Sequence, residues 1–440
     1  MTSASTLDRM SPELRRVAER AKREPEGKFH AVAHLIDEAA LGRAFHRLRK
    51  DAAVGVDGVT VANYGRDLEC KLEDLHRRLV TMTYRHQPIR RVHIPKRDGK
   101  TRPIGVGATE DKVVQGALRD VLEAVYEQDF KSCSYGFRPG RGAHDAMREL
   151  RRATAPGHVR CILEADIKAF FDTVDRTLLL EMIRSRVPDG SLLRLISKCL
   201  HVGVLDGETY AEPEVGTAQG SVLSPILGNI YLHHVLDVWF EREVKPRMAG
   251  EVTLVRYADD FVIAFEKTAD AERVMAVLPE RFRRFGLELH PEKTRLIPFA
   301  CPRWEQARGK GPATFNFLGF TWFWKKTRKG RWSAMCKTMS ARLSRAFQSA
   351  YDFCRSHRHE SMKAQHDGLS RRLRGHLNYF GVNGNVDSLH KLLQRVRRIW
   401  FKWLNRRSQR QSITWERFNA LTASVYPFPL ARIYVRIWSG

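Results

Sequence analysis

The sequence predicts an α+β fold, and three observations support this prediction. First, short runs rich in β-branched and aromatic residues alternate with longer segments of helical periodicity through the middle of the chain. Second, these segments do not recur at a fixed period, which argues against a repeat protein. Third, the pattern beyond about residue 338 becomes helical and strongly basic. We therefore place a domain boundary near residues 330–340.

The charge of the chain indicates a polyanionic partner. The 440 residues carry a formal net charge of +26, and an excess this large favours nucleic acid first and an acidic membrane surface second. With 43% hydrophobic and 10% aromatic residues, the chain is typical of a globular protein rather than a disordered basic tail. Since no apolar run reaches the roughly 18–20 residues that span a bilayer, we expect no membrane insertion.

The cysteines and the first residues indicate the cellular compartment in which the protein is expected. The seven cysteines are scattered and none is spaced as C-x-x-C, which argues against a disulfide scaffold and against a zinc finger or ribbon. The first residues lack the apolar core of a secretory signal. We therefore expect a cytoplasmic protein with reduced thiols. Residues 1–27 are polar and are expected to be a poorly ordered N-terminal segment.

Three elements are expected in the next part of the chain. Residues 29–53 have helical periodicity, and the glycines of "GVDGVT" supply turn chemistry after them. Residues 90–106 predict two short strands joined by a tight turn at Asp98-Gly99, which is a β-hairpin. Residues 111–130 predict a helix with one apolar stripe, made of Val114, Ala117, Leu118, Val121, Leu122 and Val125.

The middle of the chain predicts strands with acidic residues at their ends. Residues 160–175, "RCILEADIKAFFDTVD", predict an apolar strand, a turn and then an amphipathic helix. Residues 254–265, "LVRYADDFVIAF", predict a pair of strands around a turn, and residues 269–289 predict a helix. The Gly- and Pro-containing residues 301–315 are expected to form a loop.

Three aspartates in these strands are candidates for a metal site. Asp166 stands at the end of the first strand, and Asp259 and Asp260 stand between the two later ones. If the two elements pair, their carboxylates meet at one edge, where they repel each other unless a hard cation such as Mg²⁺ lies between them. The alternative is an acidic turn pair and an unrelated capping aspartate, and spacing alone does not decide between the two.

The order of several motifs resembles that of reverse transcriptases. "RYADDFVI" resembles their Y-x-D-D hairpin, and "EADIKAFFDTVD" resembles the motif that carries their first aspartate. Among reverse transcriptases, the chain is similar to the group II intron reverse transcriptase/maturases over roughly residues 30–405. The other motifs that carry the resemblance are "GVDGVT", "PKRDGKTRPIGV", "SYGFRPGRGAHDA", "GTAQGSVLSPILGNIYLHHVLD", "GLELHPEKT", "FNFLGFTW" and "LRGHLNYFG".

The resemblance implies a right-hand polymerase built of fingers, a palm with an antiparallel sheet, and a helical thumb. In this chain, residues 28–155 would hold the N-terminal extension and fingers, and residues 156–335 the palm with interleaved fingers elements. Residues 336–440 would form the basic thumb, or maturase domain. The residues after the thumb motif are too few for the DNA-binding and endonuclease domains of larger intron proteins. We therefore expect DNA synthesis without target cleavage.

The resemblance also assigns the metal ligands. Asp166, Asp259 and Asp260 would hold two Mg²⁺ ions, with Mn²⁺ as a substitute, and the backbone of Ile167 would add a contact. Two such ions can activate a primer 3′-hydroxyl and stabilise the leaving pyrophosphate. Asp259 is the safer ligand of the pair, and Asp260 is the one that could serve only to brace the site.

Further residues are assigned to nucleotide and primer by position. Arg90, Lys96 and Arg102 would grip the incoming triphosphate, with a solvated strand edge as the alternative. Phe170 would act as a steric gate against the ribose 2′-hydroxyl, and its neighbour Phe171 would belong to the core, with an exchange of the two roles as the alternative. Lys293 would also contact the nucleotide, and a plain surface lysine is an equal alternative for this residue. The remaining assignments are Gln219 for the nucleotide and Tyr257, Phe317, Leu318 and Gly319 for the primer.

The basic C-terminal region is expected to bind RNA. From residue 388 to residue 415 there are eight Lys or Arg and no Asp or Glu. On a helix, Leu393, Val396, Trp400 and Trp403 share one face. The surrounding cations, among them Arg397 and Arg398, suit the phosphates of a primer–template duplex or of structured intron RNA.

The sequence therefore predicts an RNA-directed DNA polymerase of group II intron type. Its expected partners are an RNA template, a DNA or RNA primer, dNTPs and group II intron RNA, whose splicing and mobility it would assist. It would be found with nucleoid or ribonucleoprotein. Two alternatives stay open: a domesticated or host-defence reverse transcriptase without an intron, and an RNA-binding splicing factor whose polymerase is vestigial.

Overall fold

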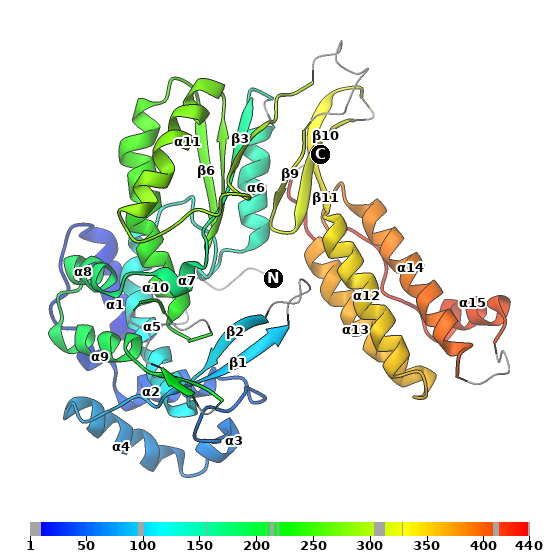
Figure 1. Ribbon diagram of the computed structural model, residues 1–440. Coiled ribbons are helices and arrows are strands. Elements are labelled where there is room, and N and C mark those ends of the chain that lie inside the picture. Colours follow the sequence, from blue (N-terminus) through cyan, green and yellow to red (C-terminus); the bar gives the residue numbers. More distant parts are fainter. Residues whose placement is uncertain are drawn as a thin grey trace.

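The computed structural model is an α+β protein, as the sequence predicts. It describes residues 10–95, 101–155, 157–207, 209–211, 215–217, 220–302, 313–327, 329–407 and 413–438. Within these ranges, three small sheets and a group of C-terminal helices form the framework (Figure 1). None of the helices in these ranges combines the length and the apolar character that a membrane span requires.

A long buried helix organises the N-terminal half. This helix, α5 (Thr109–Asp129), was expected from its apolar stripe, and all six residues of that stripe are buried. The helices and turns around it are α1 (Pro12–Arg23), η2 (Ala33–Leu35), α2 (Glu38–His46), α3 (Val61–Tyr64) and α4 (Leu68–Val80).

The prediction that residues 1–27 are poorly ordered is wrong for α1. Ser11 caps this helix, and Leu14, Ala18 and Ala21 are buried in the same core as α5. These three residues recur at helical spacing, so a helix that is polar over most of its surface still buries one apolar stripe.

The first sheet contains the hairpin that the sequence predicted. Strands β1 (Ile89–Pro95) and β2 (Thr101–Val106) pair antiparallel, and β1 also pairs with β4 (Val204–Asp206) in parallel. Strand β5 (Thr209–Ala211) completes the order β2-β1-β4-β5. Two helices precede β4 along the chain, α8 (Arg176–Arg186) and α9 (Gly190–Leu200).

The second sheet, called the central sheet below, is buried on both faces, between two core clusters. Its order is β6-β7-β3-β8, and all neighbours are antiparallel. Leu163 of β3 belongs to one core cluster, whereas the adjacent Ile162 belongs to another, as the alternation of a strand requires. The elements of this region are α6 (Ala143–Thr154), β3 (Cys161–Asp166), α7 (Phe170–Thr173), β6 (Val252–Tyr257), β7 (Asp260–Phe265), α11 (Thr268–Arg283) and β8 (Arg295–Pro298).

A long helical segment connects the first sheet to the second. It begins as α10 (Ser224–Leu232), whose residues are all buried apart from Pro225, and its last turns are wider π-helical turns. These turns are η3 (His233–Asp237) and η4 (Phe240–Val244), followed by the 3₁₀ turn η5 (Lys245–Arg247).

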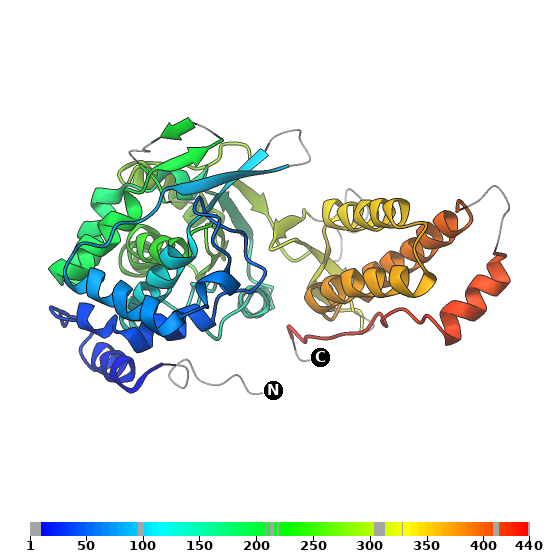
Figure 2. The same cartoon turned by 90° about the horizontal axis from the view of Figure 1, so that it is seen from below.

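The third sheet leads into the C-terminal helices. Strands β9 (Phe315–Phe317), β10 (Phe320–Lys326) and β11 (Trp332–Thr338) form an antiparallel meander, and the helices start at Ser340. Most of the loop expected at residues 301–315 falls outside the described residues. Figure 2 shows the helices as a group beside the rest of the molecule. They are α12 (Ser340–Ser356), α13 (Met362–Phe380), α14 (Val386–Leu404) and α15 (Trp415–Ser424).

Candidate active site

Two aspartates lie directly opposite each other in the central sheet. Asp166 is the last residue of β3 and Asp260 is the first residue of β7, and the two are register partners in the antiparallel pair. Residues directly opposite in such a pair have side chains on the same face, about 5 Å apart at Cβ. Asp259 belongs to the two-residue turn that joins β6 to β7. All three predicted carboxylates therefore meet at one end of the sheet.

The crowding of these carboxylates changes the acidity of Asp260. Burial raises the pKa of Asp260, and the negative charges of Asp259, Asp166 and Glu164 raise it further, to about 7. A backbone hydrogen bond from Leu318 works in the opposite direction. A carboxyl group whose pKa is raised by burial and by neighbouring carboxylates is typical of a functional carboxylate cluster.

A lysine partly compensates the charge of Asp166. The Nζ of Lys293 lies 2.5 Å from Oδ2 of Asp166. The loop that carries Lys293 is fixed by its backbone, because the His290 N–H donates to the Asp166 carbonyl at 2.8 Å. Ile167, next in the chain, forms a β-bridge with Leu289 and has a buried side chain. Lys293 is thus an exposed lysine that pairs with one aspartate of the cluster, and its role toward the nucleotide stays a prediction.

The donor set fits a hard divalent cation. Carboxylate and carbonyl oxygens are the ligands that Mg²⁺ prefers, and the mutual repulsion of the aspartates favours a cation between them. Among the described residues, no group of three His, Cys, Asp or Glu side chains is arranged to hold one metal ion. Asp166 is engaged by Lys293, so an ion would have to displace that ammonium.

A buried arginine supports the turn that carries Asp259. The side chains of Arg256 and Asp237 are both fully buried, and Nε of Arg256 donates to Oδ1 of Asp237 at 2.8 Å. The same guanidinium donates to the Ala258 carbonyl at 3.0 Å, and to Asn229 and Ser134. Sequence reasoning missed this residue. Its signal was a charge inside an apolar strand, since a buried charge requires partners.

A second hairpin turn lies beside Asp260. Leu318 and Gly319 join β9 to β10, and both have positive φ, 51° and 80°. The C-terminal helices fasten this turn, because the Tyr379 hydroxyl donates to the Leu318 carbonyl at 2.9 Å. Phe317 belongs to the core. Among the residues predicted for the primer, Leu318 and Gly319 of the turn therefore lie beside Asp260, and the ring of Phe317 does not. Tyr257 is half-buried at the end of β6, opposite Asp260.

The burial of the two phenylalanines after Asp166 is the reverse of the prediction. Phe170 is 3% exposed and belongs to the core, where its ring faces Gly228 of α10. Phe171 is half-buried and packs at the margin of that core. The cause is the left-handed turn at Ala169, with φ of 47°, which starts α7 and turns Phe170 inward. Because the Phe170 ring is buried, Phe171 is the better placed of the two to contact a nucleotide sugar, and the gate at Phe170 stays a prediction.

Of the three predicted cations of the first hairpin, the structure describes only the side chain of Arg90. Arg90 donates through Nε and Nη2 to the Val54 carbonyl, at 3.1 and 2.7 Å. It therefore ties β1 to the loop after α2. Lys96, Gln219 and the side chain of Arg102 lie outside the described residues, although the backbone of Arg102 pairs with Ile94.

The two arginines predicted for α14 differ in their surroundings. Arg397 is half-buried and donates to Asn419 at 2.8 Å and to Thr422 at 2.9 Å, which joins α14 to α15. Arg397 therefore has a structural role, and its contact with nucleic acid stays a prediction. Arg398 is exposed. The apolar face of α14 packs as expected, with Val396, Trp400 and Trp403 buried.

Comparisons with known proteins agree with this geometry. Residues 94–322 match the family model described as "Reverse transcriptase (RNA-dependent DNA polymerase)". Protein YkfC of Escherichia coli is 33% identical over 275 residues, which are 55% of this chain and 71% of YkfC. The group II intron-encoded protein LtrA of Lactococcus lactis is 35% identical over 215 residues, which are 47% of this chain and 36% of LtrA.

A third relative has a higher identity over a shorter aligned segment. The 91 kDa protein in the cob intron of Schizosaccharomyces pombe is 44% identical over 154 residues, which are 35% of this chain and 19% of that protein. The chain thus aligns with well under half of the two intron-encoded relatives.

Proposed function

Because the chain belongs to the reverse transcriptase family, we propose that it is an RNA-directed DNA polymerase of the group II intron type. The observation that carries this proposal is the pairing of Asp166 with Asp260 across β3 and β7, with Asp259 in the adjoining turn. Three carboxylates held together by the sheet provide the oxygen ligands for the metal ions that nucleotidyl transfer needs. The similarity to LtrA supports the intron type.

The proposed layout is that of a right hand. The central sheet with α11 corresponds to the palm, and residues 28–155 with the β1–β2 hairpin correspond to the N-terminal extension and fingers. Helices α12–α14 correspond to the thumb or maturase domain. The turn at Leu318 and Gly319 supports this layout, because it contacts both Asp260 of the sheet and Tyr379 of α13.

The cofactor of the reaction is a divalent ion, as in reverse transcriptases generally, and we propose Mg²⁺ with Mn²⁺ as a substitute. Asp166 and Asp259 would hold the ions, with Asp260 and the Ile167 carbonyl completing the set. When bound, the ions would acidify the primer 3′-hydroxyl and balance the charge of the phosphates. The raised pKa of Asp260 supports this, because a cation removes the repulsion that raises it.

The remaining residues position the substrates and handle a proton. The turn at Leu318 would hold the primer end beside Tyr257, and Phe171 would contact the sugar of the incoming nucleotide. The ammonium of Lys293 would be freed from Asp166 and would donate a proton to the leaving pyrophosphate oxygen. This role suits a lysine whose Nζ already lies within the carboxylate cluster.

The partners proposed are an RNA template, a primer, dNTPs and structured intron RNA. Exposed cations on the C-terminal helices support RNA binding, since they can contact phosphates without breaking the helical core. Those on α13 and α14 are Lys363, Arg371, Arg372, Arg374, Lys391, Arg395, Arg398 and Lys402. We propose that the protein acts with its RNA as a ribonucleoprotein and assists splicing.

Extension of an oligo(dT) primer on poly(rA) with Mg²⁺ tests the polymerase directly. We expect incorporation of dTMP that depends on the RNA template. Tight binding of the RNA with no incorporation would instead favour a splicing factor whose polymerase is vestigial. Splicing of a group II intron RNA at low Mg²⁺, with and without the protein, tests the maturase role separately.

A further inference from the structure

A cysteine, a histidine and an aspartate form a row away from the carboxylate cluster. The Sγ of Cys199 lies 2.9 Å from Nε2 of His86, and Nδ1 of His86 lies 3.1 Å from Oδ1 of Asp111. The Tyr84 hydroxyl donates to the same Asp111 oxygen, and the Gln87 N–H donates to its other oxygen at 3.1 Å. A nucleophile, a base and a group that orients the base are therefore in hydrogen-bonding contact.

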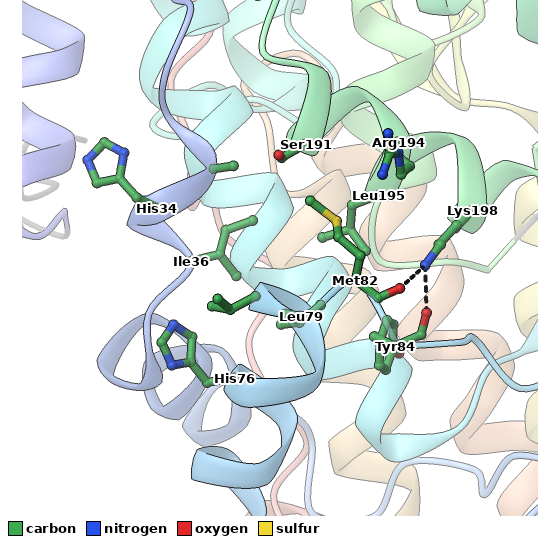
Figure 3. Close-up of a pocket in the computed structure, with 12 residues that line it drawn as sticks. His34, Ile36, His76, Leu79, Met82, Tyr84, Ser191, Arg194, Leu195 and Lys198 are labelled. Carbon is green, nitrogen blue, oxygen red and sulfur yellow. Dashed lines mark hydrogen bonds between the residues drawn. The ribbon is translucent and has the colours of Figure 1, made fainter.

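Three separate elements hold this row in place. Cys199 is in the last turn of α9, His86 is in the segment before β1, and Asp111 is in the first turn of α5. Figure 3 shows how the segment before His86 is fastened to α9: the Nζ of Lys198 donates to the carbonyls of Met82 and Tyr84, at 3.1 and 2.8 Å. The geometry is fixed by the fold and does not depend on one flexible side chain.

The histidine is buried and yet favours its charged form. The side chains of His86 and Asp111 are 2% and 4% exposed. Burial by itself lowers the pKa of His86, but Cys199 and Asp111 outweigh it and raise this pKa to about 10. A protonated imidazole in hydrogen-bonding contact with a cysteine sulfur is an arrangement that can activate a cysteine as a nucleophile.

The residue that carries this sulfur also lines a cavity. Cys199 is half-buried and lines a cavity of about 450 Å³ together with Ile89, Arg91, Gly216 and Thr217. One lining residue of this cavity is linked to the candidate active site. The Thr217 N–H donates to the carbonyl of Phe171 at 2.6 Å.

We propose that Cys199 is a modification site for low-molecular-weight disulfides. The Cys199 thiolate attacks one sulfur of the disulfide, so that a new S–S bond forms and the original S–S bond breaks. The other half leaves as a thiolate with the electron pair of the broken bond and takes up the proton from Nε2 of His86. Cys199 is oxidised, the leaving half is reduced, and excess free thiol reverses the step.

The mixed disulfide has a consequence for polymerisation that rests on the proposed function. The added group occupies the cavity beside Gly216 and Thr217, and it presses on the segment that holds Phe171. We expect the KM for dNTP to rise severalfold on modification, and reduction with dithiothreitol to restore it.

Dithiodipyridine, followed by mass spectrometry of each cysteine, tests the chemistry without reference to polymerisation. Cys301 is half-buried like Cys199, and Cys70 is exposed, so both serve as controls within the same chain. We expect Cys199 in the native protein to react about tenfold faster than Cys70, and faster than Cys199 in the urea-denatured chain. A native rate for Cys199 below that of Cys70, or below its own denatured rate, overturns the proposal.

Two variants complete the test. His86→Gln should slow the reaction of Cys199 and leave that of Cys70 unchanged, whereas an unchanged Cys199 rate contradicts the role of His86. If His86→Gln does not fold, the comparison of native with denatured rates still decides.

Cys199→Ala should keep its KM in the presence of the reagent. Labelling of Cys199 with no rise in KM overturns the effect on polymerisation, whereas an inactive unmodified protein counts against the proposed function instead.

Discussion

Arg256 and Asp237 form an ion pair in which both side chains are completely buried, and this pair supports the turn that carries Asp259. The two donor–acceptor distances are 2.8 and 2.5 Å. The remaining N–H groups of Arg256 reach Asn229, Ser134 and the Ala258 carbonyl. The residue before Asp259 is therefore anchored from beneath the sheet, which gives the carboxylate cluster a rigid base.

Asp237→Asn should destabilise the protein severely. The substitution leaves the buried charge of Arg256 without its counter-ion, which costs about 3–5 kcal/mol. Urea unfolding measures this loss. Glu241→Gln is the matched control, because it removes an exposed pair with Lys245 at 3.1 Å, and such pairs contribute about 1 kcal/mol or less. Equal effects of the two substitutions would contradict the importance of the buried pair.

Asp260 should make the metal-free protein less stable as the pH rises. Its pKa is raised to about 7 in the folded state, against about 4 in an unfolded chain. The folded state therefore binds more protons than the unfolded state between these values, and stability falls from about pH 4 to about pH 7. In EDTA, Asp260→Asn should remove this loss and be more stable than wild type at pH 8 by up to about 4 kcal/mol.

Unfolding by urea at pH 5 and pH 8 gives the readout for Asp260. The gain of Asp260→Asn should shrink at the lower pH, because wild-type Asp260 is then largely protonated. Asp352→Asn changes an exposed carboxylate far from the cluster, and it should show no such pattern. A constant difference between wild type and Asp260→Asn across the pH range would contradict the crowding of charges.

Lys293→Met should lower the Mg²⁺ concentration at which the protein is half-saturated. The ammonium of Lys293 competes with the ion for Asp166, and the loss of an exposed pair corresponds to about a two- to fivefold change. Thermal shift during a Mg²⁺ titration measures the midpoint without need of catalysis. Lys168→Met is the control, since Lys168 pairs with Glu288 at 3.0 Å at similar exposure. An unchanged or higher midpoint for Lys293→Met would argue against the competition.

The two adjacent phenylalanines should separate stability from sugar discrimination. Phe170→Ala empties a core position and should cost about 3–5 kcal/mol in thermal or urea unfolding. Phe171→Ala should cost less and should increase incorporation of rNTPs relative to dNTPs in primer extension. Increased rNTP use by Phe170→Ala, with Phe171→Ala unaffected, would return the gate to Phe170.

The sequence was sufficient for some of these features because local pattern determined them. The alternation in residues 254–265 and the run before Asp166 predicted strands, and pairing of the two strands then placed the carboxylates together. The burial of Phe170 was not predictable, because it depends on the left-handed backbone at Ala169. The apolar face of α14 followed from periodicity, whereas the contact of Arg397 with α15 depends on how two helices pack.

The partners of Arg256 illustrate the same limit over longer distances. Ser134, Asn229 and Asp237 come from three different segments, and only the fold brings them to one guanidinium. The charge within an apolar strand indicated that partners must exist, but nothing in the sequence identified them.

Primer extension by Asp259→Asn tests the central proposal most directly. The substitution keeps the shape of the turn and removes one carboxylate charge, so we expect the rate of RNA-templated dTMP incorporation to fall about a hundredfold or more. Asp352→Asn should keep the wild-type rate, and both variants should bind the primer–template normally. Incorporation by Asp259→Asn at the wild-type rate would contradict the assignment of the active site.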